Sequence, residues 1–219
     1  MGFLTGTEID WFAEAVRLLR DELPSIEVIL VSETSPELAS ALLRGKVDVA
    51  FLRPEAEMPD LAFKHLTSEP LVVVLPSDHR LAVLEAINPR DIEGETFVNV
   101  SNTAPTLRVV IDSYLGRSGV SIATAHEAAS LSMAISLVAS TRGVALLPVY
   151  ALNFLPRSVV SRPLAGDPPT INLVLGYHKA NTSPLLKLFL SRTDDLIAGV
   201  SRRFRGLGGF PPADGPDRP

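Results

Sequence analysis

The sequence predicts an α/β protein made of two similar units, and three observations lead to that prediction. Helix and strand patterns alternate along most of the chain, with short links between them. The expected strands are near-continuous runs of Val, Ile, Leu and Ala, which is typical of parallel sheets covered on both faces. The second half also echoes the first, because RGKVDVAFL at 44–52 has a counterpart in TRGVALLP at 141–148.

The first expected unit begins with an amphipathic helix that ends before Pro24. Its apolar positions fall at helical spacing and include Ile9, Phe12, Ala13, Val16, Leu19 and Leu23. A second helix ends at Gly45, a residue type favoured just past a helix C-terminus. We expect the strands of this unit at 26–32, 47–52, 62–66 and 71–75.

The second expected unit repeats the alternation. Its strands are predicted at 96–100, 121–125 and 143–148, and its helices from Pro105 onward and over 129–140. A late strand at 171–178 and a closing helix at 184–203 could return the chain to the first unit. In open α/β sheets, ligands bind outside the carboxyl ends of the strands. Two such units facing one another would make a cleft lined by the turns that follow the strands.

Composition excludes several functions. The 219 residues suffice for one large or two small domains. The net charge of −5 argues against unaided binding to DNA, because DNA phosphates attract basic domains. The absence of cysteine excludes disulfides and thiolate metal sites. Glu8 and Asp10 come too early for a signal peptide, and no run approaches the ~18 apolar residues of a membrane span. We therefore expect a cytoplasmic protein with no membrane partner.

Catalytic and metal-binding patterns are missing from the sequence. The four histidines, none with metal-ligand spacing, are His65, His79, His126 and His178. The sequence contains no Ser-His-Asp triad motif, no glycine-rich phosphate loop and no carboxylate dyad. Asp48 opens an apolar strand, and we interpret it as a hydrogen-bonded strand-edge residue. The prediction is therefore a protein that is not an enzyme and that carries neither cofactor nor metal.

At this point four segments show a resemblance to the effector-binding domain of LysR-type transcriptional regulators. They are ELASALLRGKVDVAFLR (37–53), EPLVVVLPSDHRLA (69–82), INPRDIEGETFV (87–98) and SLVASTRGVALLP (136–148). Each segment alone is weak, but four in the right order and spacing are specific. The resemblance covers nearly all of residues 2–203.

The resemblance implies a periplasmic-binding-protein-like fold of type 2, with two Rossmann-like subdomains, a two-strand hinge and a cleft. Subdomain I would comprise residues 1–75 with the returning helix at 179–203, and subdomain II residues 76–178. Residues 204–219 are rich in Pro and Gly, and we expect them to form a disordered tail.

The resemblance also implies a ligand sensor. A small metabolite would bind between the subdomains and change the geometry of a homodimer or homotetramer. Promoter DNA would be contacted only through an N-terminal winged helix-turn-helix, which the sequence lacks, as in a regulatory domain separated from its DNA-binding head. The stretches EIDWFAEAV and AHEAASLSMAISLVAS are similar to regulators of aromatic-compound catabolism, which suggests an aromatic or related carboxylate as effector.

Two other functions stay open from the sequence. A periplasmic-type solute-binding protein would share the cleft, although the missing signal peptide argues against it. An enzyme on the same scaffold would need a cluster of perturbed titratable groups in the cleft.

Thr5, Gly6 and Thr7 match the family's first effector loop. They precede a helix N-terminus, whose free N–H groups and positive dipole suit a carboxylate. The alternative is that Thr7 simply caps its helix. Glu8 lies in the first helical turn, where its charge would compete with an acidic ligand.

Thr34 and Ser35 match the second effector loop. Here the alternative is again a helix cap, either Thr34 with Glu37 in a capping box or Ser35 with Pro36 at the first helical position.

The second subdomain supplies the remaining candidates. Ser101, Asn102 and Thr103 match the loop after its first strand, where the alternative is ordinary turn chemistry. The next strand-to-helix connection is matched by His126, Glu127 and Ser130, of which we predict His126 and Ser130 as ligand contacts.

Overall fold

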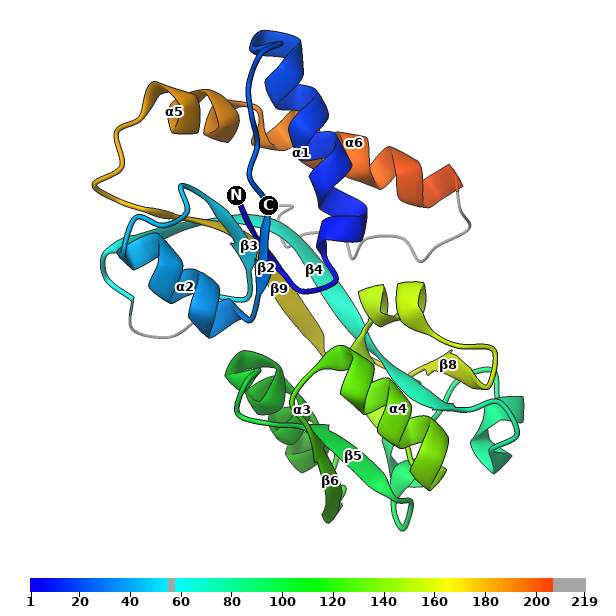
Figure 1. Ribbon diagram of the computed structural model, residues 1–219. Helices are drawn as coiled ribbons and strands as arrows, with labels where there is room; N and C mark the ends of the chain where they lie inside the picture. Colours follow the sequence, from blue (N-terminus) through cyan, green and yellow to red (C-terminus); the bar gives the residue numbers. More distant parts are fainter. Residues whose placement is uncertain (55–57, 207–219) are drawn as a thin grey trace, which may run out of the picture. The chain divides into compact units, whose positions relative to one another are not determined.

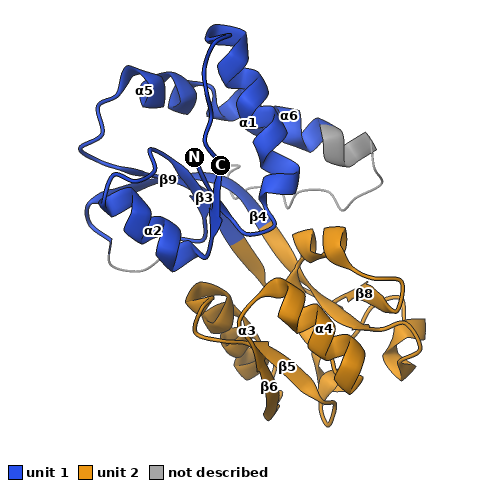
Figure 2. Cartoon of the chain, viewed as in Figure 1, with its two compact units in different colours: residues 1–68, 172–219 blue, residues 69–171 orange. Residues whose placement is uncertain are grey.

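The computed structural model describes residues 1–54 and 58–206, and the chain divides into two compact units (Figure 2). Unit 1 comprises residues 1–68 and 172–219, and unit 2 comprises residues 69–171. The chain passes from one unit to the other within two long strands, β4 (Leu61–Pro76) and β9 (Thr170–His178). Of the predicted disordered tail, residues 207–219 lie outside the described residues.

Unit 1 is an α/β sandwich on a mostly parallel sheet (Figure 1). Besides its parts of β4 and β9, its elements are β1 (Gly2–Leu4), α1 (Glu8–Glu22), β2 (Val31–Glu33), α2 (Ser35–Leu43), β3 (Ala50–Leu52), α5 (Pro184–Ser191) and α6 (Thr193–Gly206). The strand order is β2-β1-β3-β9-β4, with β1 parallel to both β2 and β3 and β9 antiparallel to β3.

Helices cover both faces of the unit 1 sheet. Phe51 of β3 packs in the core under α1, α5 and α6, whereas its neighbours Ala50 and Leu52 join the core under α2, because successive strand side chains point to opposite faces. The Phe3 and Phe51 rings stack with centroids 4.4 Å apart, and the Trp11 ring lies 5.8 Å from that of Phe51. The single tryptophan is therefore a core residue.

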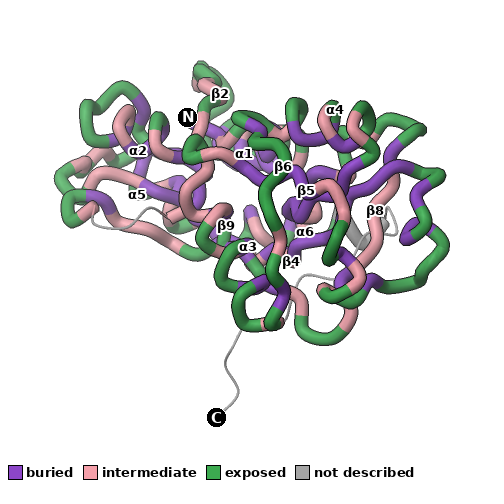
Figure 3. The backbone as a smooth tube through the Cα atoms, turned by 90° about the horizontal axis from the view of Figure 1, so that it is seen from below, coloured by how far each residue is buried: buried purple, intermediate pink, exposed green. Residues whose placement is uncertain are grey.

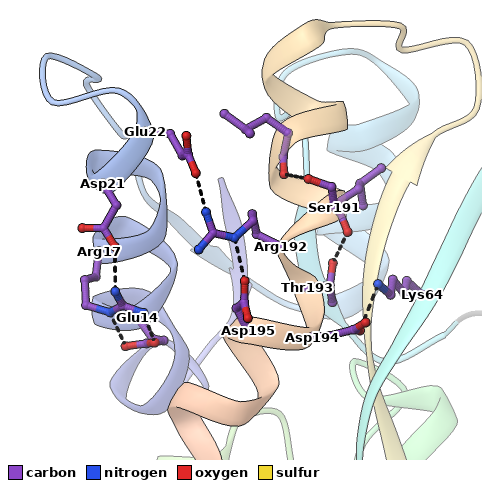
Figure 4. A network of polar contacts seen from close by, with 12 residues as sticks. Glu14, Arg17, Asp21, Glu22, Lys64, Ser191, Arg192, Thr193, Asp194 and Asp195 are labelled. Carbon is purple, nitrogen blue, oxygen red and sulfur yellow. Dashed lines mark hydrogen bonds and ion pairs between the residues drawn. The ribbon is translucent and has the colours of Figure 1, made fainter.

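The predicted closing helix at 184–203 is instead two helices, α5 and α6, separated at Arg192. The Thr193 hydroxyl donates to the carbonyl of Leu190 at 2.8 Å, a carbonyl that a continuous helix would give to the N–H of residue 194. Arg192 itself bonds Asp195 and reaches across to Glu22 of α1 (Figure 4). Arg192, which lies at the break, thereby links the end of α5 to α1.

Unit 2 has its own sheet elements and core. It contains β5 (Phe97–Val100), α3 (Pro105–Arg117), β6 (Thr124–Ala128), α4 (Leu131–Thr141), β7 (Ala145–Pro148), β8 (Val159–Pro163) and the short 3-10 helices η1 (Arg80–Val83), η2 (Pro89–Ile92) and η3 (Val149–Phe154). β5 and β6 are parallel, whereas β4 pairs antiparallel with β7 and with β8. Among the described residues of the chain, no helix is long and apolar enough to cross a membrane.

Several expected strands differ from the structure in extent. Of the predicted strand 26–32, only Val31 and Ser32 pair with β1, in a strand that continues to Glu33. The Ile29 carbonyl accepts from the amino group of Met1. The second strand of unit 2 runs over Thr124–Ala128 rather than 121–125, in register with β5. The two candidates at 62–66 and 71–75 form the single strand β4.

Gly143 offers a test of the packing beside β7. A Cβ atom there would lie 2.6 Å from the backbone oxygen of Thr96, which is held by a hydrogen bond from the Val144 N–H. We expect Gly143→Ala to lower the free energy of unfolding by about 1–3 kcal/mol, the usual effect of overpacking. The control is Gly116→Ala in α3, where a Cβ meets nothing within 4 Å and stability should be unchanged or slightly raised. Urea denaturation measures both, and equal midpoints for the two variants would contradict the prediction.

Candidate functional site

In unit 1, parallel pairing brings two of the predicted loops together. The carboxyl ends of β1 and β2 lie at the same edge of the sheet, because the two strands run in the same direction. The N–H of Thr5 donates to the carbonyl of Glu33 at 3.1 Å, and the Ser32 hydroxyl donates to that of Thr5 at 3.2 Å. Thr5 is exposed at this edge.

Thr7 and Gly6 have structural roles in the first loop. The Thr7 side chain is buried, and its hydroxyl donates to the carbonyl of Leu4 at 2.8 Å instead of capping α1. The alternative of an ordinary side-chain cap is therefore wrong for Thr7. Gly6 has a φ of 99°, a conformation that residues with a Cβ rarely adopt.

Glu8 folds back onto the loop that precedes it. Its Oε2 accepts from the Gly6 N–H at 2.7 Å, and its Oε1 accepts from the Ser32 hydroxyl at 3.3 Å. The carboxylate therefore occupies an N–H that the sequence offers to an acidic ligand, and it places a negative charge between the two loops of unit 1.

At the second loop, Thr34 is the helix cap and Ser35 joins α2 to β3. Thr34 and Glu37 form the capping box: the Glu37 N–H donates to the Thr34 hydroxyl oxygen at 3.4 Å, and the Thr34 N–H donates to the Glu37 carboxylate at 3.1 Å. The Thr34 hydroxyl also donates to that carboxylate at 2.7 Å, and this bond lowers the pKa of Glu37. Ser35 is buried, and its Oγ accepts from the Arg53 N–H at 2.9 Å.

In unit 2, the loops after β5 and β6 are also joined. The Ser101 N–H donates to the carbonyl of Ala128 at 2.9 Å, and the Thr103 hydroxyl donates to that of Ala129 at 2.9 Å. The Ser101 and Thr103 hydroxyl oxygens are themselves 2.9 Å apart. The structure therefore places these two predicted residues beside each other, at the carboxyl edge of a parallel strand pair.

The other predicted residues of unit 2 differ in their surroundings. Ser130 caps α4, because its Oγ accepts from the Met133 N–H at 3.2 Å. Asn102 is exposed, and its side chain makes no hydrogen bond with any residue that the structure describes. His126 lies within β6, two residues before the strand ends, on the exposed strand shown in green in Figure 3. Asn102 and Ser130 therefore lie in the loops that the sequence predicts, whereas His126 lies on strand β6.

Arg108 is a candidate that the sequence reasoning missed. It lies in the first turn and a half of α3, and its Nη1 donates to the Val100 carbonyl and to Glu127, both at 2.9 Å. Its Nε donates to Asp112 at 2.9 Å. These bonds, to Glu127 first and then to Asp112, raise the pKa of Arg108. The Arg108–Asp112 spacing in RVVID was the available signal, since i,i+4 pairs share one helix face.

A cavity of about 250 Å³ lies elsewhere in unit 1. Its lining includes Met1, Val31 and Val49, which stand at the amino ends of β1, β2 and β3. None of the predicted site residues lines it, because those follow the carboxyl ends of the strands. Across the described ranges 1–54 and 58–206, no three His, Cys, Asp or Glu residues are grouped so as to hold a metal ion.

Comparison with protein families matches residues 1–195 to the LysR substrate binding domain. The chain belongs to this family. The family is a regulatory domain and not an enzyme, and its members bind small-molecule effectors, so the periplasmic solute-binding alternative is not favoured.

Similar LysR-type proteins support the assignment. The chain is 28% identical over 202 residues to the Hca operon transcriptional activator HcaR of Escherichia coli K12, covering 92% of this chain and 68% of HcaR. It is 27% identical over 208 residues to the transcriptional regulator AlsR of Bacillus subtilis 168, covering 91% and 69%. The chain thus spans about two thirds of the length of these regulators.

Solved LysR effector-binding domains confirm the fold. A BenM variant domain superimposes with a TM-score of 0.78 at 17% identity, covering 98% of this chain and 97% of that one. The QuiR domain in complex with shikimate gives 0.77 at 20% identity, covering 92% and 95%. These domains have the periplasmic-binding-protein-like fold of type 2, as the sequence predicts.

Thr34 provides a test of the second loop. We expect Thr34→Ala to lower the free energy of unfolding by about 0.5–2 kcal/mol, because it removes the cap of α2. The control is Thr182→Ala, since Thr182 is exposed and its side chain bonds no described residue. Thermal unfolding of both variants measures the difference, and an unchanged melting temperature for Thr34→Ala would show that the capping box contributes nothing.

Proposed function

We propose that the protein senses a small-molecule effector through the polar loops described above and, within a LysR-type regulator, transmits binding to transcription. The family match over residues 1–195 carries this proposal. Two structural neighbours were solved with small molecules, QuiR with shikimate and the CcmR regulatory domain with 2-PG, which supports the capacity of the fold for such ligands.

The hydrogen bonding suggests two roles for the ten predicted site residues. We assign direct ligand contact to the residues whose side chains are exposed or half-buried and cap no helix: Thr5, Ser101, Asn102, Thr103 and His126. The others hold the loops in place: Thr34 and Ser130 cap helices, Thr7 and Ser35 are buried, and the Gly6 N–H donates to Glu8. This division favours an oxygen-rich ligand that exchanges hydrogen bonds with hydroxyl groups.

Coupling to transcription requires two arrangements of the regulator. An effector shifts their balance only by binding one arrangement more tightly than the other. We propose that the arrangements belong to a homodimer or homotetramer in the cytoplasm, and that promoter DNA is contacted by a separate winged helix-turn-helix. The acidic charge of the chain, −5, agrees with DNA contacts being made elsewhere.

The test is a thermal-shift screen of the purified chain against small metabolites, with acids, neutral compounds and amines equally represented. A ligand at 100 times its dissociation constant stabilises by about 2.7 kcal/mol, which raises the melting temperature by about 5–10 °C for a chain of this size. Ser101→Leu should abolish the shift. Ser136→Leu, at an exposed position of α4, should leave it intact.

Two results would contradict the proposal. One is a screen in which no compound of any charge stabilises the protein. The other is a compound whose stabilisation survives both Ser101→Leu and Thr5→Leu, because that compound binds away from the loops.

A further inference from the structure

Arg108 places a half-buried positive charge at the carboxyl end of β5. Its side chain is 25% exposed, and its Nη1 donates at 2.9 Å to the carbonyl of Val100, the residue directly before Ser101. The guanidinium group therefore lies beside the hydroxyl-rich loop that carries Ser101 and Thr103.

The guanidinium group has donors to spare. An arginine offers five N–H groups in a planar fork that matches a carboxylate. The bonds of Arg108 use Nε and Nη1, and Nη2 donates to no residue within the described part of the chain. The guanidinium group of Arg108, with Nη2 unused beside the Ser101 loop, is therefore suited to bind an anion in addition to its own acidic partners.

The two acidic partners of Arg108 are held differently. Asp112 also accepts from the side-chain amide of Asn99, which is buried, so it is fixed from two sides. Glu127 is 54% exposed on β6, and Arg108 is its one partner among the described residues. An ion pair this exposed contributes little stability, so its replacement by another carboxylate costs little.

We propose that Arg108 binds the carboxylate of an acidic effector, and that Glu127 is the internal carboxylate that this ligand displaces. The inference rests on the proposed function and names the chemical class of the ligand and the residue that selects it. Ser101 and Thr103 would then bond the oxygen atoms of the same ligand. In unit 1, the Gly6 N–H already donates to Glu8, so we expect the carboxylate of the ligand to bind unit 2.

The experiment measures dissociation constants by NMR titration of the chain with acetate and benzoate, each compared with its neutral amide, acetamide and benzamide. The signals followed are the amides of Ser101 and Thr103 and the side-chain Nε–H of Arg108. We expect saturable shifts with the acids and none with the amides.

Two substitutions should change acid binding in opposite directions. Arg108→Gln should weaken it at least about tenfold, because a charge-assisted bond is lost. Glu127→Gln should tighten it about fivefold or more, because the competing charge is removed. Controls are Arg117→Gln at the exposed end of α3 and Glu85→Gln, an exposed acid in the same unit, which should change neither affinity nor fold.

Three outcomes would overturn the inference. They are no saturable binding of either acid, unchanged affinity in Arg108→Gln, and unchanged or weaker affinity in Glu127→Gln, as a purely structural ion pair requires. If the inference fails while a neutral or cationic compound stabilises the chain in the thermal screen and loses that effect in Ser101→Leu, the proposed function still stands. If that screen also yields nothing, both have failed.

Discussion

The parallel pairing of short strands is the constraint on which the loops of this protein depend. Because β1 runs parallel to β2, and β5 to β6, the turns that follow each pair meet at one edge of the sheet. Residues far apart in the sequence, such as Thr5 and Ser32 or Thr103 and Ala129, are thereby brought to hydrogen-bonding distance. Antiparallel pairing would send consecutive turns to opposite edges and leave no such cluster.

The same polar residues serve the fold and are candidates for the ligand, and the structure separates these uses by hydrogen bonding. A buried hydroxyl that already bonds the backbone, as those of Thr7 and Ser35 do, gains little from a ligand, since its bond would have to be exchanged. The exposed hydroxyl of Thr5 accepts from Ser32 but donates to no described residue, so its proton can bond a ligand in place of water. Loop polarity alone does not distinguish these two kinds of hydroxyl.

The charged groups beside the loops differ between the two units, and only the one in unit 1, Glu8, is suggested by the loop sequence. Glu8 places a carboxylate between the loops of unit 1, whereas Arg108 places a guanidinium group beside the loop of unit 2. A helix N-terminus favours anions in both units, but in unit 1 the protein supplies the anion itself. The two units therefore place groups of opposite charge beside loops of similar polarity.

The sequence by itself determined the alternation of helices and strands, the α/β class and the family, and it predicted the capping box at Thr34 as one of two possible caps. These features depend on periodicity and on neighbours a few residues apart. Only the tertiary structure decided that β2 is shorter than its apolar run, that α5 and α6 are separate, and that Glu8 folds back onto Gly6. It also decided the partners of Arg108 outside its own helix, the Val100 carbonyl of β5 and Glu127 of β6. Each of these outcomes depends on which backbone or side-chain group is within reach across the fold, and one-dimensional spacing does not carry that information.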